Sequence, residues 1–251
     1  MSLYLDYHPK TLQGVVGHDV LVKNLLRILS KSTFEAFWLS GVSGCGKTSL
    51  AQCLANHMCG PMDVTQLAGT DCGVDAVEDV RRNFALSTWG PSGWKAIVVN
   101  EAHKITDRAV DAWLCLLDPD QNGHLLRKRL VLFTSTEELG KDLFGASTGG
   151  LGRRCKSFTL KPDVDAFAAY AKHVADGEEL NGGNWPVEKF AARIKYRQGS
   201  LGMVLQDIEA GVFMEGSPAP VIIEPLVTTP SAAVVDADMV LEEIISGGAC
   251  G

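Results

Sequence analysis

One short stretch decides the fold: Gly41-Val42-Ser43-Gly44-Cys45-Gly46-Lys47-Thr48. It fits the pattern GxxxxGK(S/T), in which glycines let backbone N–H groups turn toward phosphate oxygens. The lysine adds a fixed positive charge, the threonine hydroxyl is a ligand for Mg²⁺, and the N-terminus of a following helix favours an anion. An apolar run at 37–39 predicts a strand directly before the stretch, and apolar residues after Lys47 predict a helix. The sequence therefore predicts a phosphate-binding loop.

ATP is the expected nucleotide, with Mg²⁺ as its metal ion. The loop residues expected to bind the nucleotide are Gly41, Ser43, Gly44, Cys45, Gly46, Lys47, Thr48 and Ser49.

Further strands and helices are expected to alternate around this loop. Runs at 96–99 and 130–133 are typical of strands buried on both faces of a parallel sheet, and residues 11–32 show the periodicity of one amphipathic helix. From about Asp163 the strand patterns stop. We expect an α/β P-loop core with a parallel sheet at 1–160 and a small all-helical lid domain at 161–212. Residues 213–251, rich in proline, are expected to be a linker or disordered acidic tail.

The charge of the chain is unevenly distributed. The 251 residues carry a formal net charge of −7, with 23 basic and 30 acidic residues. No lysine or arginine follows Arg197, whereas six of the acidic residues follow Gly211. Residues 1–210 thus hold all 23 basic and 24 acidic residues, a balance of −1. A nearly neutral body is compatible with a few local contacts to nucleic-acid phosphates.

Composition also bears on the compartment. The seven cysteines include no CxxC pair and no spacing typical of zinc ligands, which indicates reduced thiols in a cytosol. The N-terminus lacks a signal-peptide pattern, and no apolar run is long enough to cross a membrane. We expect a cytoplasmic protein without a membrane partner.

A second motif follows the strand expected at 96–99. Glu101 is placed to orient and deprotonate an attacking water, although a solvated loop carboxylate is the alternative. Asn100 occupies the position where P-loop ATPases carry a metal-binding aspartate. An amide supplies no negative charge, but its oxygen can hold a metal-bound water. The expected metal residues are therefore Thr48 and, weakly, Asn100.

Four further segments resemble one family. They are Tyr7-His8-Pro9-Lys10-Thr11 with Val15-Val16-Gly17-His18, then Leu132-Phe133-Thr134-Ser135, Arg153-Arg154-Cys155, and Gly199-Ser200-Leu201-Gly202. Together with the loop, these segments resemble the small ATPase subunits of sliding-clamp loaders, within the AAA+ ATPases. That group includes the replication factor C small subunits and the bacterial gamma- and tau-like subunits. The resemblance runs from Tyr7 to about Ala210.

The resemblance implies a role for several residues. Val16 and Gly17 would border the adenine pocket, and Ser135, with Thr134 as the next candidate, would hold the γ-phosphate or the attacking water. Arg154 would reach the ATP of a neighbouring subunit, although alone it would read as a surface cation. The expected catalytic residues are thus Glu101, Lys47, Ser135 and, in trans, Arg154. Gly202 stands where the family has an arginine that contacts the nucleotide from the lid.

The resemblance also implies partners: other clamp-loader subunits, a sliding clamp and primed double-stranded DNA. The DNA-binding candidates are Arg81, Arg82 and, more weakly, Lys104, although a solvated helix face explains the two arginines equally well. The family's helical collar domain is not expected, because only about forty low-complexity residues follow Gly211.

The sequence thus favours an ATP-binding clamp-loader subunit in DNA replication, with weak or complex-dependent hydrolysis because of Asn100 and Gly202. Two alternatives stay open. One is another AAA+ machine acting on DNA, such as a Holliday-junction motor or a helicase loader. The other is an ATP-binding structural subunit with little turnover of its own.

Overall fold

The computed structural model describes residues 2–136, 151 and 153–215. Within these residues, five parallel strands form one sheet in the order β2-β3-β4-β1-β5. Their bounds are β1 (Phe34–Gly41), β2 (Val64–Ala68), β3 (Lys95–Asn100), β4 (Arg129–Ser135) and β5 (Lys156–Leu160). Because the strands are parallel and β4 lies between β3 and β1, the carboxyl ends of β1, β3 and β4 lie side by side at one edge. Polar residues that follow these strands are therefore brought together.

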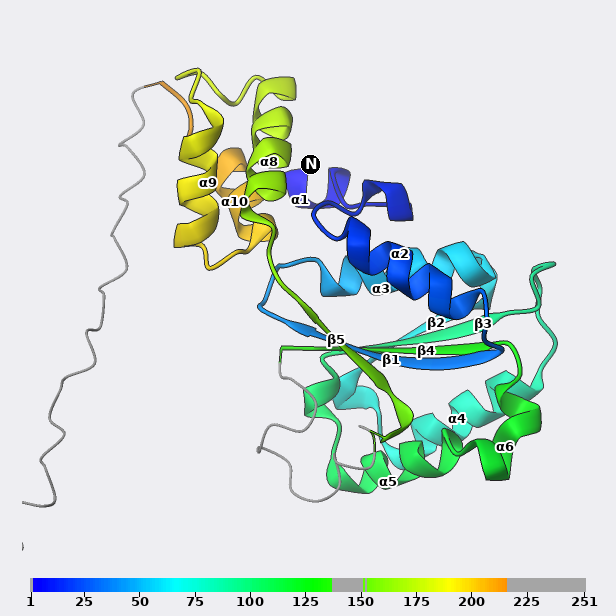
Figure 1. Cartoon of the computed structure of the whole chain (residues 1–251). Helices are drawn as coiled ribbons and strands as arrows, with labels where there is room; N and C mark the ends of the chain where they lie inside the picture. Colours follow the sequence, from blue (N-terminus) through cyan, green and yellow to red (C-terminus); the bar gives the residue numbers. More distant parts are fainter. Residues whose placement is uncertain (1, 137–150, 152, 216–251) are drawn as a thin grey trace, which may run out of the picture.

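Helices cover both faces of the sheet (Figure 1). One face carries α2 (Asp19–Leu29) and α3 (Lys47–Cys59), and the other carries α4 (Val74–Ala85), α5 (Asp107–Leu116) and α6 (Pro119–Leu126). Because side chains of a strand alternate between faces, Ala96 and Val98 of β3 pack toward α3, whereas Ile97 and Val99 pack toward α4 and α5. One apolar core thus packs on each face of the sheet.

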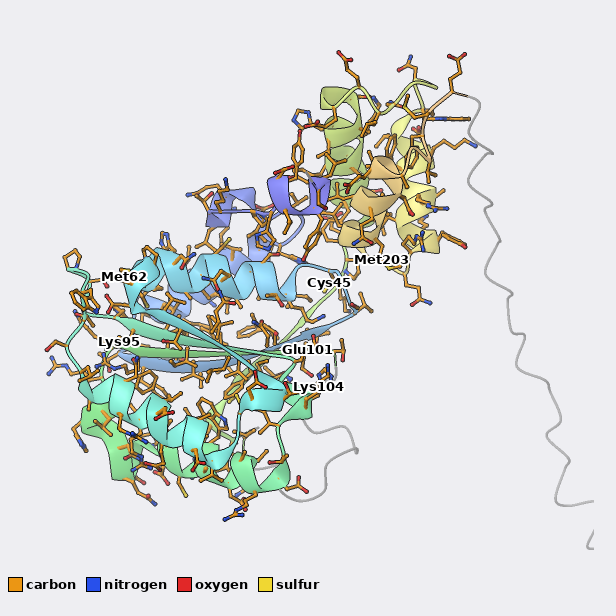
Figure 2. All side chains as sticks on the ribbon, turned by 180° about the vertical axis from the view of Figure 1, so that it is seen from behind. Cys45, Met62, Lys95, Glu101, Lys104 and Met203 are labelled. Carbon is orange, nitrogen blue, oxygen red and sulfur yellow. The ribbon has the colours of Figure 1, made fainter. Side chains whose placement is uncertain are left out.

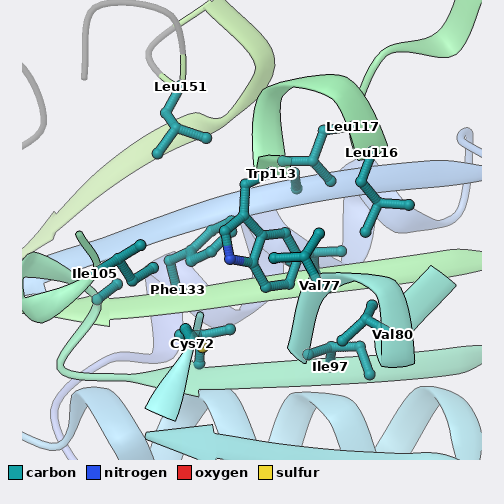
Figure 3. Packing of buried hydrophobic residues seen from close by; sticks show 14 of the residues in the cluster. Cys72, Val77, Val80, Ile97, Ile105, Trp113, Leu116, Leu117, Phe133 and Leu151 are labelled. Atoms are coloured by element: carbon teal, nitrogen blue, oxygen red, sulfur yellow. The ribbon is translucent and has the colours of Figure 1, made fainter. Parts of the chain in front are cut away.

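The core beneath the sheet is built on Trp113 of α5. Its indole is fully buried and meets the Phe133 ring edge to face, with ring centroids 5.2 Å apart. Figure 3 shows Val77 and Val80 of α4 and Ile97 of β3 closing around the same indole. This packing fixes α5 against the strands whose ends carry the candidate site.

A third group of helices follows β5 and lies beside the sheet (Figure 1). It comprises α8 (Val164–Gly177), α9 (Val187–Tyr196) and α10 (Leu201–Glu209), which share one apolar core with Leu3 of the short helix α1 (Leu3–Asp6). Phe213 is buried in this core and stacks on Phe190, with centroids 4.1 Å apart. We call α8, α9 and α10 the helical group. The predicted fold class, a parallel-sheet α/β core followed by helices, is confirmed.

The predicted helix at 11–32 is wrong at its start. The structure has a 3-10 turn, η1 (Leu12–Gly14), and α2 begins only at Asp19. Gly17 breaks the helix with a φ of +73°, and a β-carbon there would lie 2.8 Å from the Phe167 ring of α8. The close contact between Gly17 and Phe167 of α8 therefore prevents the helix from starting at residue 11, where the local apolar pattern predicted its start.

Two strands, β2 and β5, were not predicted. Both are edge strands with exposed residues, so neither forms the continuous apolar run that marked β1, β3 and β4. The predicted tail at 213–251 lies outside the described residues from 216 onward. Among the described residues, no helix has the length and apolarity needed to cross a membrane. The six cysteines described are free thiols, and Cys250 lies outside this part.

Candidate nucleotide-binding site

The predicted phosphate loop joins β1 to α3, as expected. Gly41, Gly44 and Gly46 have φ values of +149°, +76° and +97°, which L side chains rarely adopt. A β-carbon on Gly41 would lie 2.6 Å from the Leu160 carbonyl oxygen. The Lys47 ammonium is largely buried and donates to the carbonyl oxygens of Gly41 (2.9 Å) and Val42 (2.8 Å). The loop conformation therefore requires these glycines, and the Lys47 ammonium is held by the backbone of the loop itself.

The loop forms the floor of a cavity of about 370 Å³, large enough for a small-molecule ligand. Figure 2 shows Cys45 of the loop between Met203 of the helical group and Glu101 at the strand ends. Three parts of the chain supply most of the wall, the loop, the N-terminal segment and the helical group, and Glu101 adds to it from the end of β3. The lining residues include Tyr4, Tyr7, His8, Val16, Ser43, Thr48, Glu101, Phe167, Tyr170, Ser200, Gly202 and Met203. Aromatic rings thus line one part of the cavity, and the phosphate loop lines another.

His18 connects the loop to the helical group, which the sequence did not predict. Its Nε2 atom lies 2.7 Å from the Cys45 carbonyl oxygen, and because a carbonyl only accepts, Nε2 carries the hydrogen. The ring is buried and meets Phe167 of α8 edge to face, with ring centroids 5.9 Å apart. The place of His18 in the N-terminal motif indicated that it lies near the nucleotide, but the motif does not specify its contacts with Cys45 and Phe167.

Ser200, the N-cap residue of α10, lies directly against the loop. A β-carbon on Gly44 would lie 2.0 Å from Ser200 Oγ, and the same oxygen accepts from Met203 N–H to cap α10. Gly202, the second residue of α10, packs against Tyr4, because a β-carbon there would lie 3.2 Å from the Tyr4 ring. The N-terminal helix thus occupies space beside the position where the family has an arginine.

At the ends of β3 and β4 the two predicted polar motifs meet. The register that pairs Val99 with Phe133 brings Asn100 beside Thr134, whose hydroxyl donates to Asn100 Oδ1 at 3.2 Å. Glu101 follows in the left-handed conformation, with a φ of +54°. Gly69 packs against this turn, since a β-carbon there would lie 2.2 Å from the Glu101 carbonyl oxygen. The backbone of Glu101 is thereby held while its side chain reaches the cavity.

Ser135 and Glu101 are linked through His103. The Ser135 hydroxyl lies 3.3 Å from His103 Nδ1, and Glu101 Oε2 lies 3.4 Å from His103 Nε2. Lys104 approaches the same carboxylate oxygen at 3.8 Å from the exposed side. Ser135 itself is buried and does not line the cavity.

Arg154 lies away from the cavity wall and pairs with Asp118, with 3.0 Å between Nη2 and Oδ2. The hydrogen bond from Arg154 is the main reason that the pKa of Asp118 lies below its usual range. The carboxylate also accepts from Asp120 N–H, which caps α6. The predicted trans-acting arginine is therefore held by its own chain.

Most of the predicted nucleotide-binding residues line the cavity: Val16, Ser43, Gly44, Cys45, Gly46, Lys47, Thr48 and Ser49. Two do not. Gly41 stands at the start of the loop and contributes its carbonyl to Lys47, and Gly17 lines a neighbouring depression between α2 and β5.

The site fits a metal ion that arrives with phosphates. Thr48 is exposed at the cavity, and Asn100 offers a neutral oxygen already engaged by Thr134. In the part of the chain that the structure describes, His, Cys, Asp and Glu side chains form no cluster of three or more that could hold a metal ion. Mg²⁺ commonly takes one or two protein ligands and completes its shell with phosphate oxygens and water.

The predicted DNA-binding cations each lie near an acid. On α4, Arg81 pairs with Glu78 at 3.6 Å and Arg82 with Asp79 at 3.0 Å, while Lys104 faces Glu101. Exposed pairs of this kind contribute little to stability, so these cations are available to exchange partners. Their role in DNA binding stays a prediction.

Comparison with known proteins gives sequence relatives and structural neighbours. No protein-family model matches the chain. A replication factor C small subunit of Haloarcula marismortui is 32% identical over 181 residues, which cover 69% of this chain and 52% of that protein. Replication factor C subunit 3 of Blastobotrys adeninivorans is 24% identical over 210 residues, covering 81% of this chain and 58% of that protein. The chain thus spans about half the length of the curated relatives it matches.

Solved structures share the fold. The RuvB Holliday junction branch migration motor of Thermotoga maritima superposes with a TM-score of 0.58 at 15% identity, covering 81% of this chain and 64% of RuvB. A DNA polymerase III gamma subunit-related protein from the same organism gives a TM-score of 0.53 at 15% identity, covering 75% of this chain and 57% of that protein.

Proposed function

The chain is a homologue of the replication factor C small subunits with the AAA+ fold, and on that premise we propose that it is an ATP-binding subunit of a sliding-clamp loader. One observation carries the proposal. The loop at 41–48, the N-terminal segment and the helical group converge on a single cavity. A nucleotide in this cavity would contact all three, so its binding would be coupled to the position of the helical group.

Different groups around the cavity would bind different parts of the nucleotide. The backbone N–H groups around Gly44 and Gly46 would surround the phosphates, together with the N-terminus of α3. Lys47 would exchange its two carbonyl partners for phosphate oxygens, because a full negative charge is the stronger acceptor. Tyr4, Tyr7 and Tyr170 offer aromatic faces and edges to the base. Mg²⁺ held by Thr48 and the phosphates would neutralise charge on the oxygens.

Hydrolysis would depend on Glu101. Its carboxylate lines the cavity and would orient and deprotonate the attacking water. Asn100 brings no charge to the metal, and Gly202 brings none from the helical group. These two positions favour slow hydrolysis, or hydrolysis only within a complex that supplies Arg154 from a neighbour. An ATP-binding subunit with little turnover is the second candidate, and the same two residues support it.

The proposed partners are other clamp-loader subunits, a sliding clamp and primed double-stranded DNA. The near-neutral balance of residues 1–210 fits an assembly that holds DNA through a few phosphate contacts from Arg81, Arg82 and Lys104. Binding of DNA by the isolated chain would then be weak and would weaken further as salt rises.

Steady-state ATP hydrolysis tests the proposal. The full chain is assayed alone, with a synthetic primer–template duplex, and with the duplex plus a sliding clamp from the same source. Stimulation by both additions supports a clamp-loader subunit. Tight ATP binding without turnover under any condition supports the second candidate instead. Stimulation by a four-way junction but not by the primer–template would favour a Holliday-junction motor.

A further inference from the structure

His103 belongs to the motif after β3 but has no part in the function proposed so far. It lies in the 3-10 turn η4 (Ala102–Lys104), and its side chain is only 14% exposed. Its two ring nitrogens face two proposed reactive-site residues, with Nδ1 3.3 Å from Ser135 Oγ and Nε2 3.4 Å from Glu101 Oε2. The imidazole therefore spans the ends of two neighbouring strands.

The donor pattern of this bridge follows from its ends. A carboxylate only accepts, so Glu101 Oε2 favours a hydrogen on Nε2, the ring nitrogen 3.4 Å away. In the neutral ring Nδ1 is then an acceptor, and the Ser135 hydroxyl donates to it. In the protonated ring both nitrogens carry hydrogens, the serine oxygen accepts, and the ring forms an ion pair with Glu101. The Nε2–Oε2 contact is an electrostatic one, and contacts of this kind commonly shorten into hydrogen bonds when the substrate binds.

The turn that carries His103 is rigid. Ala102 and Ile105 on either side of it are buried, and Lys104 N–H donates to the Glu101 carbonyl oxygen at 2.9 Å. Gly69 closes against that same carbonyl. The Glu101 side chain, in contrast, is 43% exposed. A largely buried imidazole beside a partly exposed carboxylate is suited to orienting it.

We propose that His103 is a positioning residue that holds the Glu101 carboxylate toward the attacking water and ties it to Ser135. The inference rests on the proposed function of the site. Lys104 reaches the same Oε2 atom, but its ammonium is exposed and 3.8 Å away, so solvent weakens its hold on the carboxylate. His103 thus provides the firmer contact to the Glu101 carboxylate.

The test measures single-turnover hydrolysis of Mg·ATP with the full chain in excess, and ATP affinity by calorimetry, for His103→Ala, His103→Gln and His124→Ala. We expect His103→Ala to slow hydrolysis about tenfold or more while the Kd for ATP changes less than about twofold. His103→Gln, whose amide keeps a donor group near Glu101, should recover part of the rate. His124→Ala removes an exposed histidine of α6 that does not line the cavity, and it should stay within about twofold of the wild-type rate.

A cycle with Glu101→Gln separates positioning from a structural role. If His103 acts through Glu101, then His103→Ala should not slow hydrolysis further in the Glu101→Gln background. A full additional loss there would overturn the inference, as would an unchanged rate in both His103→Ala and His103→Gln. A wild-type chain that binds ATP but never cleaves it would also overturn it, leaving the proposed ATP binding intact. A chain that fails to bind ATP would instead remove the proposed function.

Discussion

Arg154 and Asp118 form an ion pair with 3.0 Å between Nη2 and Oδ2, and the same carboxylate caps α6. The arginine proposed to act on a neighbouring subunit is thus oriented by its own chain. Arg154 lies between β4 and β5, and Asp118 is the N-cap residue of α6. The ion pair therefore connects the segment proposed to face a neighbouring subunit to a helix beneath the sheet. Arg154 would have to release or share Asp118 when it reaches a phosphate.

The first prediction concerns this pair. Arg154→Ala should lower ATP turnover of the assembled protein by about 10³-fold without changing its own ATP affinity, because the guanidinium would act in trans. Asp118→Asn keeps the helix cap and removes the charge, so it should lower turnover less. Arg153→Ala, which removes the adjacent exposed cation, is the control. Turnover is measured by steady-state ATPase assays, and affinity by ATP titration. Equal turnover in Arg154→Ala and Arg153→Ala would contradict a trans-acting role.

The second prediction concerns Asn100. Asn100→Asp should raise the rate of ATP hydrolysis, because aspartate supplies the charge that a metal site prefers. The change preserves size, and an aspartate oxygen can still accept from Thr134. The rate is measured at saturating Mg·ATP with Thr134→Val as a companion that alters the same contact without adding charge. No gain in rate would sink the idea that Asn100 limits hydrolysis.

The third prediction tests the contact between the loop and the helical group. Gly44→Ala should weaken ATP binding and lower the melting temperature, because its β-carbon would collide with Ser200 in a left-handed backbone. Combining it with Ser200→Gly should restore part of both. Gly123→Ala, whose β-carbon would meet nothing within 4 Å, is the control and should cost little or stabilise α6. Identical behaviour of Gly44→Ala and Gly123→Ala would argue against close contact.

The fourth prediction concerns the stability of the helical group. Asp207 is largely buried on α10 and accepts from Arg193 Nε at 2.7 Å and from Arg197 Nε at 2.8 Å. Burial alone would raise the pKa of Asp207, but the hydrogen bonds from Arg197 and Arg193 outweigh it and leave the pKa below its usual value. Asp207→Asn should therefore lower the free energy of unfolding by about 3 kcal/mol.

The pH dependence of this contribution has a definite sign. A carboxylate whose folded-state pKa is depressed stabilises the fold above its ordinary pKa of about 4, and the stabilisation is lost as pH falls through the folded-state value. Urea unfolding between neutral and acid pH should show that Asp207→Asn costs less at low pH. Asp165→Asn, at an exposed position on α8, serves as control. A cost that stays constant with pH would contradict the assigned ion pairs.

The central strands and the phosphate loop could be predicted because both leave local signals. Strands β1, β3 and β4 are buried on both faces, which produces continuous apolar runs, and the loop has a fixed pattern of glycines and lysine. The edge strands β2 and β5 include exposed residues and so lack a continuous apolar run. The start of α2 could not be predicted either, because it depends on the contact of Gly17 with Phe167, a residue far away in the sequence.

The candidate site divides in the same way. Its residue types could be placed at strand ends from the sequence, but their pairings could not. His103 meets Ser135 only because parallel strands align the ends of β3 and β4, and Arg154 meets Asp118 across 36 positions of chain. Such contacts arise from the register of the sheet and the packing of α5 and α6 beneath it, and no short pattern encodes them.

Calorimetric titration of the full chain with Mg·ATP tests the central claim most directly, in parallel with Lys47→Met, which keeps the length of the side chain and removes its charge. The account predicts one ATP per chain for the wild type and at least about tenfold weaker binding for Lys47→Met, since a charge-assisted hydrogen bond contributes about 1.5–3 kcal/mol. Lys31→Met, at an exposed position after α2, should bind like the wild type. Equal affinity of the wild type and Lys47→Met, or no binding by the wild type, would contradict the account.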